Sequence, residues 1–384
     1  MSTCFDFDEA PDLAASDALR WQRYAGRDVI PLWIADTDFR APECVRDALA
    51  ARVGTGIYAY ASEPADLRET IVDHLARQYG WHIHPDWLVL LPGVVPGLHA
   101  AVRHLTAPRD HVLVPRPVYP HLLKAAQGAT RALTELPLAL CDNRWQVPSA
   151  VLRGALRPES RLLMVCNPHN PGGTVLRRHE LESMADIADA HDLWICSDEI
   201  HADLVLDPAL RHIPIASLSP EISRRTVTLM SVNKVFNFPG AGLAWAVAEN
   251  PVLREAMGRD LHAIMSEPSL FGYVATRAAL QGGAAWHLAL LDYLRGNRDL
   301  LQARISAMPG LRLAPVEASY LAWIDASALG IADPTAFFLA HGVALSPGSQ
   351  FGADCGQFVR LNFGTQRARL TAALDRMEKA LSSL

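Results

Sequence analysis

Apolar residues in the middle of the chain gather in short continuous runs, which are separated by longer stretches of helical periodicity. Six runs are predicted to be buried strands, at residues 87–91, 111–115, 161–166, 193–197, 226–231 and 243–248. An apolar segment that ends near Leu105 and an amphipathic stretch over 177–191 are expected to be helical. Continuously apolar strands that alternate with helices are typical of a mostly parallel sheet covered on both faces. The sequence therefore predicts an α/β domain.

After about Phe271 the pattern changes. A long helical run is expected up to about Ala307, with a weak point in its middle at Gly296–Asp299. Shorter strand-like and helix-like segments follow at 311–315, 319–325, 333–341, 343–347 and 358–363, and a terminal helix begins near 367. This indicates a smaller α+β domain. We expect a large domain over 46–280 and a small domain made of 1–45 and 281–384, which suits a chain of 384 residues.

Composition and charge exclude several classes of function. The formal net charge is −6, and the basic residues are scattered, so neither nucleic acid nor a membrane surface is expected as a partner. No HExxH or paired-ligand spacing occurs among the 15 histidines, and no metal site is expected. The six cysteines form no CxxC pair and are predicted to be reduced thiols of a cytoplasmic protein; they are Cys4, Cys44, Cys141, Cys166, Cys196 and Cys355.

Candidate chemistry follows the predicted strands. In an open α/β sheet, ligands bind beyond the carboxyl ends of the strands. Four strand ends carry Gly93 in PGVVPG, Asn170 in NPHNPGG, Asp198 in SDEIHAD and Lys234 in SVNKVFN. An amine, a carboxylate, a neutral donor and a helix N-terminus are the groups that pyridoxal 5′-phosphate (PLP) requires. Taken singly, Lys234 could be solvated, Asp198 a helix cap and Asn170 a turn former, so their convergence carries the prediction.

Longer motifs run in order through nearly the whole chain. They are PLWIADTDFRAP (31–42), GIYAY (56–60), LPGVVPGL (91–98), PRPVYP (115–120), NPHNPGG (167–173), SDEIHADLV (197–205), HIPIASL (212–218), SVNKVFNFPG (231–240) and FVRLNF (358–363). With them the chain resembles the MalY/PatB family of cystathionine β-lyases, within the class I/II aminotransferase superfamily. The resemblance implies a fold-type I PLP-dependent transferase, with a mostly parallel sheet of the seven-stranded type between helices and a smaller α+β domain.

The resemblance also implies roles around the cofactor ring. Lys234 would be the Schiff-base lysine and then the acid and base at the substrate Cα. Asp198 would pair with the pyridine N–H, and Tyr119 would stack on the ring. Asn170 and His201 would contact the phenolic oxygen of the ring, although a lone histidine beside an apolar run is commonly a hydrogen-bonded core residue.

Phosphate and substrate contacts are implied as well. Backbone N–H groups of Gly93, Val94 and Val95 would hold the phosphate, with the Ser231 hydroxyl beside them. Tyr60 would reach the phosphate of a second subunit, which implies a homodimer with active sites at the interface. Arg360 would clamp the α-carboxylate of an amino-acid substrate, a task suited to its bidentate guanidinium, although it could also pair with a structural carboxylate.

The reaction implied is carbon–sulfur β-elimination from cystathionine or another cysteine S-conjugate. An aminotransferase is the alternative, since both reactions begin at the same site, and a regulatory protein on the same scaffold is a further one. Asn233 and Val235 stand where the family usually has Ser and Thr, and Thr37 stands in IADTDF where Met is usual. These departures bear on the choice of substrate rather than on the catalytic groups.

Overall fold

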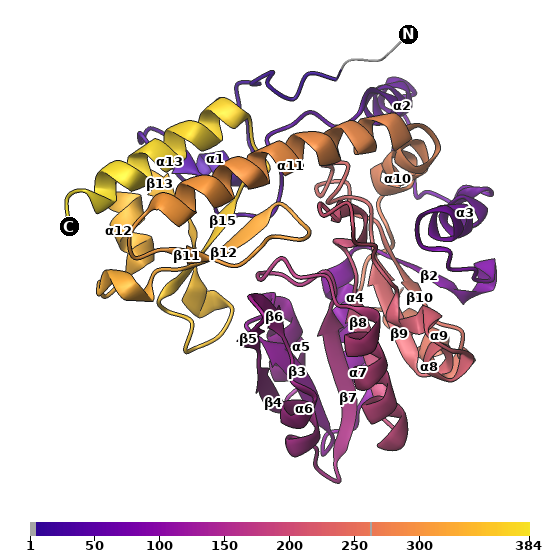
Figure 1. Cartoon of the computed structure of the whole chain (residues 1–384). Helices are drawn as coiled ribbons and strands as arrows, with labels where there is room; N and C mark the ends of the chain where they lie inside the picture. Colours follow the sequence, from indigo (N-terminus) through magenta and orange to yellow (C-terminus); the bar gives the residue numbers. More distant parts are fainter. Residues whose placement is uncertain (1–4, 262) are drawn as a thin grey trace.

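The computed structural model describes residues 5–261 and 263–384 (Figure 1). Its central sheet has seven strands in the order β2-β10-β9-β8-β7-β3-β4. Their bounds are β2 Leu88–Leu91, β3 His111–Arg116, β4 Ala132–Pro137, β7 Ser160–Cys166, β8 Trp194–Asp198, β9 Thr226–Met230 and β10 Ala244–Val247. Strands β9, β8, β7, β3 and β4 pair in parallel, whereas β10 is antiparallel to both β9 and β2. The predicted mostly parallel sheet is confirmed.

Alternate residues of these strands enter two different cores. Leu162 and Met164 of β7 pack under α4 (Val94–Leu105), α5 (Pro120–Gly128) and α9 (Pro251–Gly258). Leu163 and Val165 face the opposite side, where α7 (Arg178–Ala190) lies with α6 (Ser149–Gly154) and α8 (Pro220–Arg224). Because successive side chains of a strand point to opposite faces, a run that is apolar throughout is buried on both faces.

A smaller antiparallel sheet lies beside the C-terminal helices (Figure 1). Its strands, in spatial order, are β11 Arg312–Leu313, β12 Leu321–Asp325, β15 Phe358–Asn362 and β14 Ser346–Pro347. Helices α12 (Pro334–Ala340) and α13 (Arg367–Leu381) accompany it. Near the N-terminus, β1 (Ile30–Pro31) pairs in parallel with β13 (Val343–Ala344). This pairing supports our proposal that 1–45 and 281–384 form one domain and 46–280 the other.

The remaining elements connect and cover these sheets. The helices are α1 Leu19–Gln22, α2 Glu43–Gly54, α3 Leu67–Tyr79, α10 Leu270–Gly282 and α11 Ala284–Ala307, and β5 Ala139–Cys141 forms a hairpin with β6 Arg144–Gln146. Short 3-10 helices lie at Pro85–Trp87, Ala202–Leu204, Ile215–Ser217, Ser327–Leu329 and Gly348–Gln350. Within the described ranges, no helix has both the length and the apolar character needed to cross a bilayer. Five of the predicted thiols are free cysteines, and Cys4 lies outside the described residues.

The weak point predicted in the long helical run was placed wrongly. The break falls at Gly283, between α10 and α11, and α11 continues through Gly296–Asp299. The Asn297 side chain donates hydrogen bonds to the carbonyls of Phe363 and Thr365, at 3.1 and 2.8 Å. A Cβ at Gly296 would lie 2.5 Å from the Arg367 guanidinium. These residues therefore serve tertiary packing, and packing overrides their low helix propensity.

Candidate active site

The carboxyl ends of the central strands open onto a cavity of about 320 Å³. Segment 34–35 and β15 of the smaller sheet close it from the other side. Nine of the residues predicted from the sequence line it: Gly93, Val94, Val95, Tyr119, Asn170, Asp198, His201, Lys234 and Arg360. Their convergence follows from the parallel strands, whose carboxyl ends meet at one edge of the sheet.

Lys234 follows β9 and is enclosed by the cavity wall. Its Nζ donates a hydrogen bond to the carbonyl oxygen of Ala35, at 2.6 Å. Burial lowers the pKa of Lys234 to about 8, because the charged form loses hydration. The Asp36 carboxylate raises this pKa, and the Arg360 guanidinium lowers it. The amine is therefore closer to its neutral, nucleophilic form at neutral pH than an exposed lysine.

Asp198 ends β8 and is 2 % exposed. Its Oδ1 accepts a hydrogen bond from the Ile200 backbone N–H, at 3.2 Å. Burial raises the pKa of Asp198 to about 7, since this bond offsets only part of the lost hydration. Such a carboxylate gains most from a cationic N–H partner, and a protonated pyridine nitrogen is one.

Arg360 and Asn170 meet in the cavity wall. The Arg360 Nη1 donates to Oδ1 of Asn170 at 3.0 Å, and Nη2 donates to the carbonyl of Trp33 at 2.9 Å. The guanidinium carbon lies 4.8 Å from the centre of the Phe351 ring. Burial lowers the pKa of Arg360 to about 10, which leaves it charged at neutral pH. Its Nε has no hydrogen-bond partner among the described residues, so the group can still donate to an anion.

Tyr119 and His201 lie on other parts of the wall. Tyr119 precedes α5, and burial raises its pKa to about 12, so the phenol is neutral. Burial lowers the pKa of His201 to about 3, and its Nδ1 has no partner within the described chain. The alternative of a hydrogen-bonded core histidine is not favoured by this contact pattern. An unpartnered ring nitrogen at a cavity is available to a ligand.

A phosphate site is available at the start of α4. The helix begins at Val94, its N-cap is Gly93, and no side chain caps it. The first backbone N–H groups of a helix lack intrahelical partners and favour an anion. Nearby, a Cβ at Gly242 would lie 2.6 Å from the Pro92 carbonyl, so glycine permits the close approach of these two backbone segments. Together with the amine of Lys234 and the carboxylate of Asp198, these groups fit PLP.

Two predicted residues do not line the cavity. The Ser231 hydroxyl donates to the carbonyl of Leu243 at 2.6 Å and accepts from the Asn233 N–H at 3.2 Å. Tyr60 lies in a loop and is fully exposed at the surface of the chain. Their proposed contacts with phosphate stay predictions.

Sequence reasoning did not identify Ile34, Ala35 and Cys166 as parts of the wall, although the structure places them there. Ala35 contacts Lys234 through its backbone carbonyl, a group that every residue has, so the residue type could not predict this contact. Asn233 was singled out only as a departure from the family. It lines the cavity, and its Oδ1 is buried without a partner among the described residues.

Comparison with known proteins adds to this geometry. The model of the family described as aminotransferase class I and II matches residues 27–377. Cystathionine β-lyase PatB of Bacillus subtilis (strain 168) is 31 % identical over 98 % of this chain and all of its own length. Protein MalY of Escherichia coli (strain K12) is 30 % identical over 99 % of this chain and all of its own length.

Solved structures are similar over the same extent. The crystal structure of OvoB is 46 % identical, with a TM-score of 0.96, and the match covers 99 % of this chain and all of that one. Cystalysin from Treponema denticola, which contains PLP, is 26 % identical, with a TM-score of 0.94 and 99 % of both chains covered. Both are full-length likenesses rather than matches to one domain.

Proposed function

The chain belongs to the aminotransferase class I and II family, and from this premise we propose that it is a PLP-dependent carbon–sulfur β-lyase. It would release a thiol, pyruvate and ammonia from cystathionine or a related cysteine S-conjugate. The full-length likeness to cystathionine β-lyase PatB carries the proposal. The convergence of Lys234, Asp198 and Arg360 on one cavity supports it.

The residues of the cavity wall would contact different parts of the cofactor. Lys234 would bond to its aldehyde carbon, and Asp198 would accept the pyridine N–H. Tyr119 would cover the ring, while Asn170 and His201 would contact its phenolic oxygen. The unpartnered Nδ1 of His201 supports its contact with the phenolic oxygen. The raised pKa of the buried Asp198 carboxylate supports its pairing with the pyridine N–H.

Phosphate would rest on the N–H groups of Gly93, Val94 and Val95, with Ser231 behind them. We propose that Tyr60 completes this site in a second subunit, so that the working form is a homodimer. Its full exposure suits a residue that acts outside its own chain. Ser231 would contact phosphate only if its hydroxyl turned from the Leu243 carbonyl.

When bound, PLP supplies an electron sink that stabilises negative charge at the substrate Cα. Arg360 would hold the α-carboxylate with its free donor, and this fixes the Cα–H bond relative to Lys234. The Lys234 amine would take the Cα proton at Nζ. The Cβ–S bond would break with its electron pair on sulfur, and the thiolate would take a proton to leave as a thiol. The remaining enamine would take up water and give pyruvate and ammonia.

An aminotransferase remains the second candidate. Aspartate aminotransferase of Pyrococcus horikoshii is 26 % identical over 92 % of this chain. The same cavity would serve it, because both reactions begin with removal of the Cα proton by Lys234.

Pyruvate formation separates the two candidates. PLP-saturated protein would be mixed with cystathionine, and separately with an S-alkylcysteine, without any keto acid. Steady release of pyruvate with an equal amount of thiol is expected. Conversion of the cofactor to its amine form without pyruvate would instead assign an aminotransferase.

Replacing Arg360 with Lys is expected to raise KM for the amino-acid substrate by about 10- to 100-fold, with a smaller loss in kcat. Lysine keeps the charge but loses the free Nε donor that is proposed to bind the carboxylate, and a hydrogen bond to a charged group contributes about 1.5–3 kcal/mol. Steady-state kinetics would measure both constants. Arg376→Lys, at an arginine that pairs with exposed Asp28, is the matched control. An unchanged KM for Arg360→Lys would remove Arg360 from the carboxylate site.

A further inference from the structure

Ile34 and Ala35 form part of the cavity wall opposite the central strands, and residues of both sheets hold the segment 33–38 that contains them. Asn362 of β15 donates to the carbonyls of Ile34 and Asp36, the latter at 2.7 Å. From the large sheet side, Asn237 accepts from the Thr37 N–H at 3.1 Å and donates to the Thr37 carbonyl at 3.0 Å. The Lys234 ammonium therefore faces a backbone that is fixed in place.

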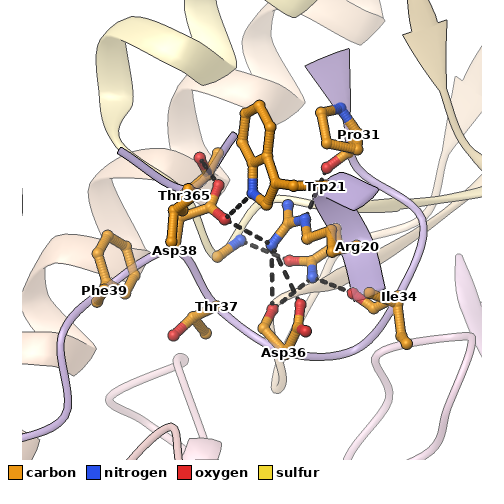
Figure 2. Close-up of polar contacts among 12 residues, drawn as sticks. Arg20, Trp21, Pro31, Ile34, Asp36, Thr37, Asp38, Phe39 and Thr365 are labelled. Carbon is orange, nitrogen blue, oxygen red and sulfur yellow. Dashed lines mark hydrogen bonds and ion pairs between the residues drawn. The ribbon is translucent and has the colours of Figure 1, made fainter. Parts of the chain in front are cut away.

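Figure 2 shows two carboxylates of this segment, and they differ in how fully they are paired. Asp38 is 1 % exposed and accepts from Trp21 at 3.0 Å, from Thr365 at 2.6 Å and from Arg369 at 2.9 Å. Arg20 lies 3.4 Å from it as well. Asp38 therefore has its acceptor capacity filled and serves to hold the segment to its neighbours.

Asp36 has spare capacity. Among the described residues, its carboxylate has one hydrogen-bonded partner, Arg20 Nη1, at 3.4 Å, and the side chain is 26 % exposed (Figure 2). Arg20 is itself shared, because its Nε donates to the Pro31 carbonyl at 2.6 Å and its Nη1 also reaches Asp38. A carboxylate held this loosely beside a cavity can accept a further cation.

Lys234 is a further cation that reaches this segment. Its Nζ already donates to the carbonyl of Ala35, the neighbour of Asp36. Resting on the proposed function, we propose that Asp36 is a positioning residue which, with the Ala35 carbonyl, receives and holds the protonated Lys234 side chain whenever the lysine is not bonded to the cofactor.

The need for such a group follows from the charges of the cavity. During turnover the lysine takes the Cα proton and becomes an ammonium close to the Arg360 guanidinium, which disfavours a second positive charge. Asp198 is the other carboxylate that acts on Lys234, but it would be committed to the cofactor ring. Asp36 is then the carboxylate that can offset the effect of the Arg360 charge on the Lys234 ammonium.

Other charged and titratable groups face this pair. The Asp36 carboxylate is influenced by Arg20 and Asp38 as well as by Lys234, and burial raises its pKa. The Tyr320 hydroxyl lies 3.4 Å from the Ala35 carbonyl, and the His201 ring is influenced by the charge of Lys234. Burial lowers the pKa of His201 to about 3 and raises that of Tyr320, so both are neutral over the range in which Lys234 titrates.

The chain has three lysines, Lys124, Lys234 and Lys379, which makes a direct titration practicable. Full-length protein without cofactor would be labelled with ¹³C at lysine Cε, and the signals would be followed by NMR against pH. Lys124→Arg and Lys379→Arg assign the signals. Asp36→Asn is expected to lower the pKa of Lys234 by about one, because a nearby opposite charge is lost. The signals of Lys124 and Lys379 should not move and serve as the internal control.

Asp36→Glu separates charge from structure. It keeps the carboxylate, and we expect it to restore most of the pKa of Lys234. An unchanged pKa in Asp36→Asn, or an equal fall in both variants, would overturn the proposal. The titration needs neither cofactor nor substrate. A normal Asp36 result with no pyruvate release by the wild-type protein would thus contradict the β-lyase and not the lysine–aspartate pairing.

Discussion

Replacing Lys234 with alanine is expected to abolish covalent attachment of PLP and to lower turnover by more than about 1,000-fold. The variant would lose the proposed nucleophile for the cofactor aldehyde and the proposed base for the Cα proton, and a positioned base alone contributes about 100- to 10,000-fold. The visible absorbance of bound cofactor and the rate of pyruvate release would measure the two losses separately.

Lys124→Ala is the matched control for this variant, since Lys124 lies in α5 outside the cavity wall. It should keep both the absorbance and the rate. A Lys234→Ala protein with the wild-type rate would contradict the proposal that Lys234 is the catalytic base.

Replacing Asp198 with alanine is expected to leave part of the cofactor binding intact while lowering kcat by about 100-fold or more. Lys234 and the start of α4 would still hold PLP, but the pyridine nitrogen would lose the carboxylate that keeps it protonated. Removal of one preorganised electrostatic group from an active site typically costs about 100- to 1,000-fold in kcat. Cofactor retained after dialysis and kcat at saturating PLP would be measured together.

The control for Asp198→Ala is Asp73→Ala, whose side chain is 69 % exposed on α3. It should behave as wild type. If Asp198→Ala kept the wild-type kcat, Asp198 could not be the partner of the ring nitrogen. Loss of all cofactor in Asp198→Ala would show instead that the carboxylate acts mainly in binding.

Much of the central sheet could be read from the sequence because its strands are buried on both faces. All residues of β9 are buried, for example, and such a run stands out as continuously apolar. The edge strand β4 was not predicted, since most of its residues are only partly buried and its pattern is mixed. Strand ends predicted four of the nine predicted residues that line the cavity, and the family resemblance supplied the other five, among them Arg360 of β15.

The contacts that the sequence could not predict are made by backbone groups or depend on a second chain. The hydrogen bond from Lys234 ends on the carbonyl of Ala35, which any residue could supply. Tyr60 is fully exposed in its own chain, and the phosphate contact proposed for it needs a second chain. Ser231 was predicted beside phosphate from resemblance, and its hydroxyl bond to the Leu243 carbonyl depends on the local turn.

The wall segment 33–38 also acts as a mechanical link. From the small sheet, Arg360 donates a hydrogen bond to the carbonyl of Trp33, and Asn362 donates one to the carbonyl of Ile34. From the large sheet, Lys234 donates one to the carbonyl of Ala35. A hinge rotation between the two sheets would have to stretch at least one of these hydrogen bonds. Bonding of Lys234 to the cofactor would remove the large-sheet hydrogen bond at Ala35, while the bonds between Asn237 and Thr37 would remain. Cofactor loading would therefore free the Ala35 carbonyl without detaching the segment from either sheet.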